Sequence, residues 1–458
     1  MISKIKSTLG GSGNRAQLLR GGIGALVLKI LNIGLSLGTS IVLTRALGAE
    51  SFGIYVYVFA LVALFSVPAQ FGMTTLIVRE TVRAETEGNW SLLRGIWRWA
   101  NITASIISVA LIICCIIYFT FFAGSNHKVS DDNAFIYAIA AIPFLALSGL
   151  RSASLQGLRK IVQSQIPEGI IRPLILIALI LFYWFFISND MTSETAVMLS
   201  VLSIIISFIF GAWLLHRETP IEVLKKPKPQ YKTKLWLKSV IPFTLLEGVG
   251  VINTQTDIVM LGIFGSATDV GLYRIASQGA SITTVGLTVV AMAAMPYFAR
   301  FYAQSDILKL SKVAVMTARA SMLLAIPFSL LFMFYGDSIL TIAFGNEFAN
   351  GYSVLMVLTI IQLLNAMFGT SGRILNMTGH EQDTLKGMLV ATFCNIVLNF
   401  IFIPSYGAVG AAWATGISIL IRNIMLWVMV YHRLGIDTSV FGVFHNENKM
   451  NNLQKINA

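Results

Sequence analysis

Long apolar segments without charged residues recur along this chain from residue 21 to residue 431. Each is close to the ~20 residues that an α-helix needs to cross the hydrocarbon core of a bilayer. Runs of Leu and Ile with interspersed Gly and Pro favour helices, because a membrane β-barrel shows short segments of alternating polarity. The pattern predicts an all-α polytopic membrane protein. Its twelve predicted transmembrane helices cover residues 21–44, 52–72, 99–123, 133–150, 168–187, 195–215, 241–263, 273–298, 314–335, 351–371, 385–403 and 409–431.

The basic residues alternate with the predicted loops. The N-terminal tail, the even-numbered loops and the C-terminal tail hold 26 of the 33 Lys and Arg residues, while the odd-numbered loops hold only Arg45 and Lys128. Because Lys and Arg are enriched in cytoplasmic loops, both termini are predicted to be cytoplasmic. The net charge of +12 therefore reflects membrane topology and attraction to anionic headgroups, and it does not indicate nucleic-acid binding.

Residues 216–240 form the longest and most basic predicted loop, and they divide the chain into two sets of six helices. Short patterns recur in the two halves, since Gly53 and Tyr55 return as Gly271 and Tyr273, an offset of 218 residues. An even number of helices per half keeps the repeats parallel, which implies a pseudo-two-fold axis along the membrane normal and a substrate path between the halves. The predicted domains are an N-terminal tail (1–20), a first six-helix bundle (21–215), a basic linker (216–240), a second six-helix bundle (241–431) and a C-terminal tail (432–458).

A second recurrence lies near the end of the fourth and tenth predicted helices. Arg151 and Gly157 return as Arg373 and Gly379, an offset of 222 residues. The same short loop therefore occupies the same place in each half, which supports the interpretation as two repeats.

Five basic residues fall within or at the ends of predicted helices: Lys29, Arg172, Arg274, Arg319 and Arg422. A charge at bilayer depth costs at least ~2.5 kcal/mol, so such residues usually face a bundle interior or a hydrated cavity. Arg172, Arg274 and Arg319 lie near helix ends, where snorkelling to the headgroups is the simpler explanation. Lys29 and Arg422 lie ~12–13 Å inside the predicted cytoplasmic ends at 1.5 Å per residue. These two predict a positively charged cavity.

Polar residues also follow helical spacing. Asn253 and Asp257 are one turn apart on the seventh helix, and Gln362 and Asn365 share a face of the tenth. Stripes on several helices predict a shared hydrated cavity, although each amide can also serve as interhelical packing contact. For Asn395 and Asn399, one turn apart on the eleventh helix, packing is the preferred interpretation.

Glu247 occupies the position that Lys29 reaches when the repeat offset of 218 is added. The two residues would lie at equivalent depths with opposite charge. We hypothesise that they pair in one conformation and separate in another, because an ion pair at low dielectric can bias a two-state equilibrium. A static pair that stabilises the fold is the alternative.

The residues that carry chemistry in enzymes form no recognisable site. Cys114, Cys115 and Cys394 lie in apolar runs, and the five His residues lie in loops and tails without metal-ligand spacing. No Walker A pattern is present. The sequence therefore predicts neither an enzyme nor a metal or cofactor site.

Three segments resemble a known family. Residues 45–55 (RALGAESFGIY), residues 257–262 (DIVMLG) followed by 270–273 (VGLY), and the stretch 395–412 ending in PSYGAVGAA are similar to signatures of bacterial polysaccharide flippases. The resemblance covers nearly the whole chain. It is best for the O-antigen (Wzx-type) flippases of the multidrug/oligosaccharidyl-lipid/polysaccharide exporter superfamily, and the related lipid II flippases usually have fourteen helices.

This resemblance implies a MATE-like fold in a bacterial inner membrane. It also implies translocation of an undecaprenyl-diphosphate-linked oligosaccharide, such as an O-antigen unit of lipopolysaccharide, from the cytoplasmic to the periplasmic leaflet by alternating access. The polysaccharide polymerase machinery would be a partner. The diphosphate is assigned to Lys29, Arg422, Arg274 and Arg319, the sugars to Asn253, Gln362 and Asn365, and coupling or gating by H⁺ or Na⁺ to Glu247 and Asp257.

Two other functions remain open. A cation-coupled multidrug exporter of the same fold would bind a cationic drug through cavity carboxylates, yet basic residues outnumber acidic ones in the predicted helices. A membrane glycosyltransferase or ligase would need a large periplasmic loop or an Asp-rich catalytic loop, and no predicted loop is long enough.

The pairing hypothesis predicts the outcome of a charge exchange. If Lys29 and Glu247 pair, replacing each by the other in one chain should restore the transport activity that either single neutral variant loses. Activity is measured as surface glycan made by a complemented deletion strain. An exchange variant as inactive as the single variants would show that pairing does not matter.

Overall fold

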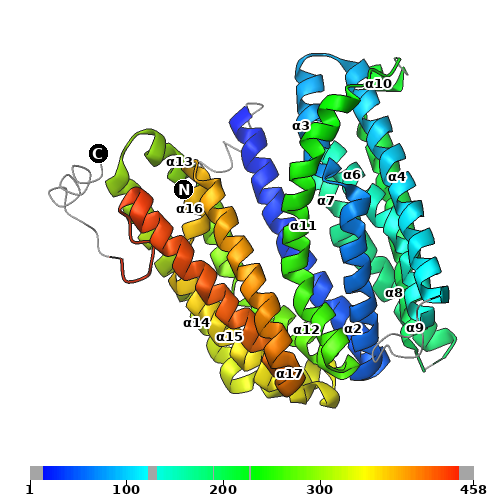
Figure 1. Cartoon of the computed structure of the whole chain (residues 1–458), viewed down its shortest axis with the longest axis vertical. Coiled ribbons are helices and arrows are strands. Elements are labelled where there is room, and N and C mark those ends of the chain that lie inside the picture. The colour runs from blue at the N-terminus through cyan, green and yellow to red at the C-terminus, as the bar shows by residue number, and fades with distance from the viewer. Residues whose placement is uncertain (1–13, 122–131, 189, 226–227, 443–458) are drawn as a thin grey trace. The chain divides into compact units, whose positions relative to one another are not determined.

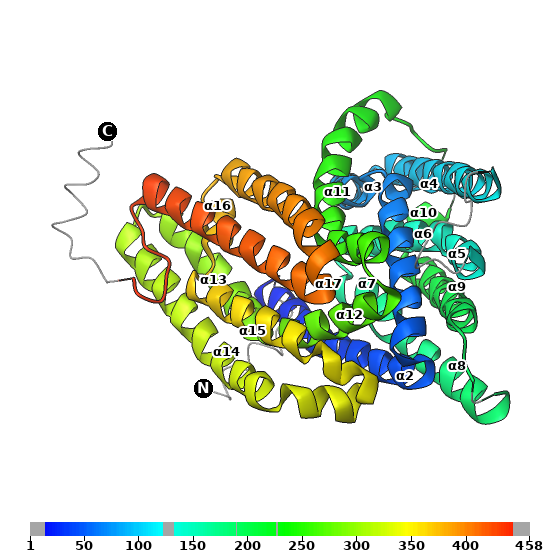
Figure 2. The same ribbon diagram turned by 60° about the horizontal axis from the view of Figure 1, so that its bottom comes forward.

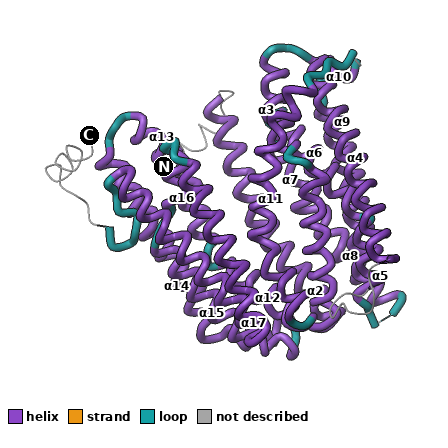
Figure 3. The backbone as a smooth tube through the Cα atoms, in the orientation of Figure 1, coloured by secondary structure: helices purple, strands orange, loops and turns teal. Residues whose placement is uncertain are grey.

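The computed structural model describes residues 14–121, 132–188, 190–225 and 228–442, and every regular element in these ranges is a helix (Figure 1, Figure 3). The chain divides into two compact units, residues 1–255 and 256–458. The predicted basic residues of both tails beyond these ranges, and Lys128, lie outside the described residues. The prediction of an all-α chain is confirmed for the part that the structure describes.

Ten of the described helices are long and apolar enough to cross a membrane. Two of them, Val27–Gln70 and Glu381–Leu434, are far longer than one crossing needs, and each contains one glycine with non-helical backbone angles. Gly48 (φ 73°) interrupts the first and Gly407 (φ 53°) the second. The chain is therefore a multi-pass membrane protein, while the predicted count of twelve depends on whether both long helices turn back at these glycines.

The first unit is built around α6, which packs against α2, α3, α4 and α9. Fully buried side chains such as Phe135, Leu76 and Ile96 fill the space between these helices. The elements are α2 (Asn14–Gln70), α3 (Met73–Thr86), α4 (Trp90–Phe121), α5 (Asp132–Ile139), α6 (Ala141–Gly157), α7 (Ile161–Ile166), the π-helical turn η1 (Pro167–Ile171), α8 (Arg172–Phe186), α9 (Ser193–Glu218), α10 (Ile221–Leu224) and α11 (Thr233–Phe264), the last of which continues into the second unit.

The predicted tail and linker differ from the structure. Helix α2 begins at Asn14, inside the predicted tail. The segment 216–240 is largely ordered on the first unit: the Gln230 amide donates to the Ser91 carbonyl at 2.9 Å, and Trp236 at the start of α11 is fully buried. The chain divides within α11, because the first part of this helix packs into the core of the first unit.

A break between α2 and α3 lets α11 approach closely. Phe71 and Gly72 both have positive φ angles, 46° and 59°. A Cβ atom added to Gly72 would lie 2.8 Å from the backbone of Phe243 and from the Val240 carbonyl oxygen. Only glycine satisfies both the left-handed backbone and this contact.

The second unit packs α14 against α13 and α15, and α15 against α12 and α17 (Figure 2). Its elements are the end of α11, α12 (Ala267–Ile282), α13 (Val285–Ala303), α14 (Ile307–Phe344), the 3₁₀ turn η2 (Asn346–Gly351), α15 (Tyr352–Met367), α16 (Ser371–Met377) and α17 (Glu381–Leu434). A buried cluster that includes Phe298, Leu310 and Ile374 joins α13, α14 and α16.

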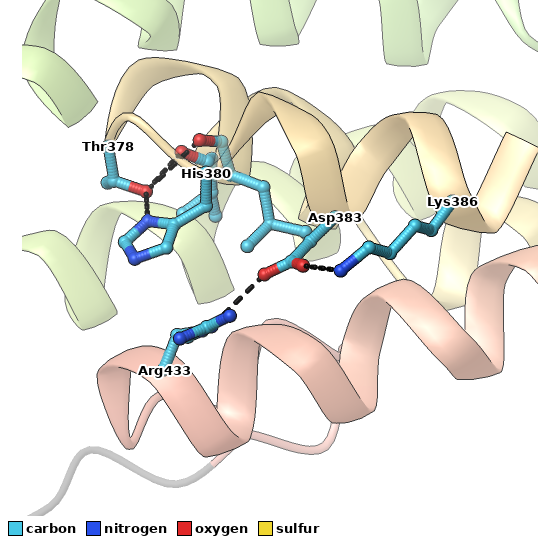
Figure 4. A network of polar contacts seen from close by, with 7 residues as sticks. Thr378, His380, Asp383, Lys386 and Arg433 are labelled. Atoms are coloured by element: carbon cyan, nitrogen blue, oxygen red, sulfur yellow. Dashed lines mark hydrogen bonds and ion pairs between the residues drawn. The ribbon is translucent and has the colours of Figure 1, made fainter.

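The two arms of α17, before and after Gly407, lie against each other. At the glycine, the Ala408 amide donates to Asp269, whose carboxylate also caps α12 through Ser266. At the other end, Arg433 Nε lies 3.1 Å from Asp383 Oδ2 (Figure 4). These contacts fix both ends of the paired arms.

The turn at Gly407 predicts a glycine requirement. A Cβ atom there would lie 2.8 Å from Asp269 Oδ1 at a φ of +53°. Gly407→Ala should therefore lower the free energy of unfolding by about 1–3 kcal/mol, measured by thermal unfolding of the purified protein in detergent. Gly250→Ala is the control, because no atom lies within 4 Å of the added Cβ. Equal stability of the two variants would contradict the strain argument.

Candidate functional site

A buried carboxylate lies at the centre of the second unit. Asp257, in the last two turns of α11, is 7% exposed. Its Oδ1 accepts hydrogen bonds from Asn395 Nδ2 at 2.9 Å and Asn399 Nδ2 at 2.7 Å. Its Oδ2 accepts from the Tyr273 hydroxyl and from Thr415 Oγ1, both at 2.6 Å. Four neutral donors thus surround one carboxylate.

Four helical segments position these donors. Asn395 and Asn399 lie one turn apart on the first arm of α17, so both amides reach the same oxygen. Thr415 lies on the second arm of α17, and Tyr273 lies in the second turn of α12. The second arm is rich in small buried residues such as Gly410 and Ala412, which allow neighbouring backbones to approach closely.

The charge of Asp257 has no basic partner among the described residues. A buried charge without a counter-charge is costly, although hydrogen bonds to the ionised form offset part of that cost. The neighbouring Asn399 Oδ1 is buried and accepts no hydrogen bond from the described residues. Carboxylate, amide and hydroxyl oxygens are the ligands that hard cations prefer. The cluster therefore suits a small cation or a proton.

The equivalent place in the first unit keeps only part of this cluster. Tyr55, the repeat counterpart of Tyr273, lies 3.0 Å from the Ser200 hydroxyl, as Tyr273 lies 3.1 Å from that of Thr415. The position 218 residues before Asp257 is Thr39, whose hydroxyl donates to the Leu35 carbonyl of its own helix. The carboxylate is therefore specific to the second unit.

Sequence reasoning found part of this site. Asp257 was predicted as a coupling residue, but Asn395 and Asn399 were interpreted as packing contacts. They do join α17 to α11, yet the bonds go to the carboxylate. Tyr273 and Thr415 were not predicted as its partners, although Tyr273 was visible as a repeated residue.

The amides predicted to meet sugars form a second polar chain in the second unit. Asn365 Nδ2 donates to Gln362 Oε1 at 3.2 Å within α15, and Asn423 Nδ2 donates to Asn365 Oδ1 at 2.8 Å from α17. Gln362 and Asn365 are half-buried. The third predicted residue, Asn253, is half-buried on α11 in the first unit and has a polar contact of its own. A role in sugar binding stays a prediction for all three.

Lys29 and Glu247 both lie in the first unit. Lys29 is exposed on α2. Glu247 accepts hydrogen bonds from the Thr74 and Thr75 hydroxyls in the first turn of α3. The ion pairs of the described residues do not join Lys29 to Glu247. Their pairing in another conformation stays a prediction.

The three predicted arginines of the second unit differ in their surroundings. Arg422 on α17 is half-buried and makes no hydrogen bond or ion pair with the described residues. Arg274 on α12 is exposed and has a polar contact. Arg319 on α14 is exposed, and its guanidinium donates to the carbonyls of Val440 at 3.1 Å and Gly442 at 3.2 Å. Arg319 therefore has a structural partner that the sequence did not reveal.

Comparison with solved structures defines the class of fold. The chain shares its fold with an inward-facing multidrug resistance MATE family transporter of the MOP superfamily, with a TM-score of 0.74 and 13% identity over 90% of this chain and 98% of that one. The lipid II flippase MurJ, in an inward closed conformation, gives a TM-score of 0.69 and 16% identity over 90% of this chain and 87% of that one. The fold is thus that of a MOP-type transporter.

Sequence comparison defines the family. A family model described as "Polysaccharide biosynthesis protein" matches residues 18–302, and a MatE model matches residues 251–404. The chain belongs to the polysaccharide biosynthesis protein family, which confirms the resemblance found in the sequence. It is 24% identical to the probable low-salt glycan biosynthesis flippase Agl15 of Haloferax volcanii over 89% of this chain and 82% of that protein. It is also 24% identical to the capsular polysaccharide biosynthesis protein CapF of Staphylococcus aureus over 53% of this chain and 61% of that protein.

The Asp257 cluster predicts a measurable loss on neutralisation. Asp257→Asn removes the charge and turns one acceptor into a donor that faces other donors, and hydrogen bonds to charged groups contribute about 1.5–3 kcal/mol each. Thermal unfolding should show a loss of a few kcal/mol, and any stabilisation by NaCl over choline chloride should disappear. Tyr273→Phe removes one donor and should lose less. An Asp257→Asn variant that unfolds and responds to Na⁺ like the parent protein would rule out a cation site here.

Proposed function

We propose that this protein is a flippase that moves a lipid-linked glycan across a membrane. The observation that carries the proposal is the joint match to a polysaccharide biosynthesis family over residues 18–302 and to a probable glycan biosynthesis flippase over 89% of the chain. The shared fold with the lipid II flippase MurJ supports it, because that protein also acts on a lipid-linked molecule. Family and fold together favour a transporter over an enzyme.

The proposed topology has twelve transmembrane helices with both termini in the cytoplasm. The two long helices would each turn at their non-helical glycine, Gly48 or Gly407, and so cross twice. The ten candidate spans would then give twelve crossings. The distribution of Lys and Arg supports the orientation.

The proposed cargo is an oligosaccharide on undecaprenyl diphosphate, moved from the cytoplasmic to the periplasmic leaflet of a bacterial inner membrane by alternating access. A diphosphate leaves the headgroup layer only if cations and hydrogen-bond donors replace its water. Arg422 fits this role best, because it is half-buried and has no bond to the described residues. Lys29 and Arg274 are exposed candidates, and Arg319 would have to keep or exchange its bonds to Val440 and Gly442.

Coupling to an ion is assigned to Asp257. A cation bound at its carboxylate would complete the neutral oxygen cluster, and protonation would remove the uncompensated charge. Both changes alter the contacts that tie α11 to α17. Glu247 is the second candidate for gating, through its threonine partners on α3.

A cation-coupled multidrug exporter is the alternative function. It is favoured by the MatE match over residues 251–404 and by the multidrug transporter that shares the fold. Such a protein would bind a cationic drug through carboxylates. The buried carboxylate of the second unit is already surrounded by donors, and Arg422 nearby in the sequence of α17 is unmatched, which favours an anionic cargo.

The flippase proposal predicts a defined defect in a deletion strain. Lipid-linked oligosaccharide should still be made but should accumulate on the cytoplasmic face, because its transfer is blocked. Radiolabelled lipid extracts and surface glycan staining measure the two effects, and the Asp257→Asn variant should fail to complement where the parent gene does. Normal surface glycan with unchanged drug sensitivity would contradict both functions. Normal glycan with increased drug sensitivity would favour the exporter.

A further inference from the structure

The helix that carries Gln362 and Asn365 is broken in the second unit only. Helix α15 ends at Met367, Gly369 has a φ of +68°, and α16 begins at Ser371. In the first unit, α6 runs without interruption from Ala141 to Gly157, through the positions related by the offset of 222. The break is therefore a feature that the two repeats do not share.

A C-terminal strap, residues 436–442, closes this break. The break leaves helix carbonyls without intrahelical donors, and a buried carbonyl without a donor is costly. The Val440 amide donates to the Met367 carbonyl at 2.9 Å, and Thr438 Oγ1 donates to the Phe368 carbonyl at 3.3 Å. Thr438 Oγ1 also lies 2.7 Å from Ser371 Oγ at the start of α16.

The strap is anchored on two other helices. Arg319 of α14 holds the carbonyls of Val440 and Gly442, and Trp427 Nε1 of α17 donates to Asp437 Oδ1 at 2.8 Å. Thr438 is 0% exposed. A strap that is bonded to three helices and buried at its centre fixes the bend between α15 and α16.

The residue that follows the break is a basic residue with an unmatched charge. Its repeat counterpart Arg151 is buried and neutralised, because Glu168 Oε1 lies 2.5 Å from its Nη2. Arg373 is half-buried, has no carboxylate partner among the described residues, and makes one long hydrogen bond there, to the Thr288 carbonyl of α13 at 3.5 Å. Burial lowers the pKa of the Arg373 guanidinium, and no carboxylate among the described residues opposes that effect.

Arg373 also lies at the level of the other unmatched arginine. A Cβ atom added to Gly372 would lie 3.3 Å from Leu426 Cδ1. Leu426 follows Arg422 by one helical turn on α17, and helical side chains point back toward the N-terminus. The two half-buried guanidinium groups are thus carried by neighbouring turns of α16 and α17.

We propose that Arg373 binds a phosphate group carried by a lipid, and that the C-terminal strap positions it for this contact. The inference rests on the proposed flippase function, and it names a binding residue that the charge pattern alone did not identify. A guanidinium presents planar paired donors that match a phosphate, so an unmatched and half-buried arginine favours such an anion. The source is either the diphosphate of the cargo or a phospholipid headgroup.

The test is lipid binding by the purified full-length protein in phosphatidylcholine nanodiscs. Two probes are titrated separately, undecaprenyl diphosphate and dioleoylphosphatidylglycerol, and bound lipid is measured by native mass spectrometry. Arg373→Gln should weaken binding of the relevant probe by about tenfold, the loss expected for one strong charge-assisted contact, and Arg373→Lys should recover part of it. Arg300→Gln is the matched control, because Arg300 is an exposed arginine at the end of α13.

The strap is tested with a conservative pair. Thr438→Val removes the hydroxyl that bonds Ser371 and Phe368, and it should weaken binding while Arg373 is intact. Thr438→Ser keeps the hydroxyl and should restore the affinity. If the valine variant does not fold, Trp427→Phe removes only the bond to Asp437 and should give a smaller loss. Equal affinity of Thr438→Val and the parent protein would overturn the positioning role.

The probes separate the possible outcomes. A loss confined to undecaprenyl diphosphate identifies the cargo as the source of the phosphate, and an equal loss for both probes identifies a headgroup site. Unchanged binding of both probes by Arg373→Gln overturns the inference and leaves the flippase proposal intact. Failure of the parent protein to bind undecaprenyl diphosphate would instead count against the proposed cargo.

Discussion

The high cost of an unmatched charge at low dielectric organises this protein. In the first unit, Arg151 is buried and meets that cost through an ion pair with Glu168. In the second unit, Asp257 is buried and relies on four neutral donors, while Arg373 and Arg422 are half-buried without a carboxylate among the described residues. Ligands of opposite charge would relieve each of these sites. The second unit therefore carries the features expected of binding sites, and the first carries the compensated version.

The same low-dielectric setting explains where the helices break. A break frees backbone groups that need partners, so each break occurs where another group reaches them. At Gly407 the Ala408 amide finds Asp269, and at Gly369 the carbonyls of Met367 and Phe368 find Val440 and Thr438. Glycine supplies the left-handed backbone at both sites. The breaks are thus built features with dedicated partners.

Hydropathy and charge predicted the helical membrane class from sequence, because span length and loop charge depend on local composition alone. The repeat offsets also led to Arg373 as the counterpart of Arg151, and the depth of Asp257 marked it for function. The rest depends on tertiary contacts that no local pattern encodes. The partners of Asp257 come from residues 16 to 158 positions away along the chain. The strap that occupies Arg319, and the packing of 228–240 onto the first unit, likewise appear only when distant segments meet.

Helix α17 links the two kinds of site in the second unit. Its first arm supplies Asn395 and Asn399 to Asp257, and its second arm supplies Thr415 to the same carboxylate and carries Arg422 two turns later. Its far end anchors the strap through Trp427. Under the proposed function, a cation at Asp257 and a phosphate at the arginines would act on the same pair of helical arms. Ligands that bias one element must change each other's affinity, and the effect is reciprocal. Coupling in this fold then needs no long pathway, because one helix pair contacts both ligands.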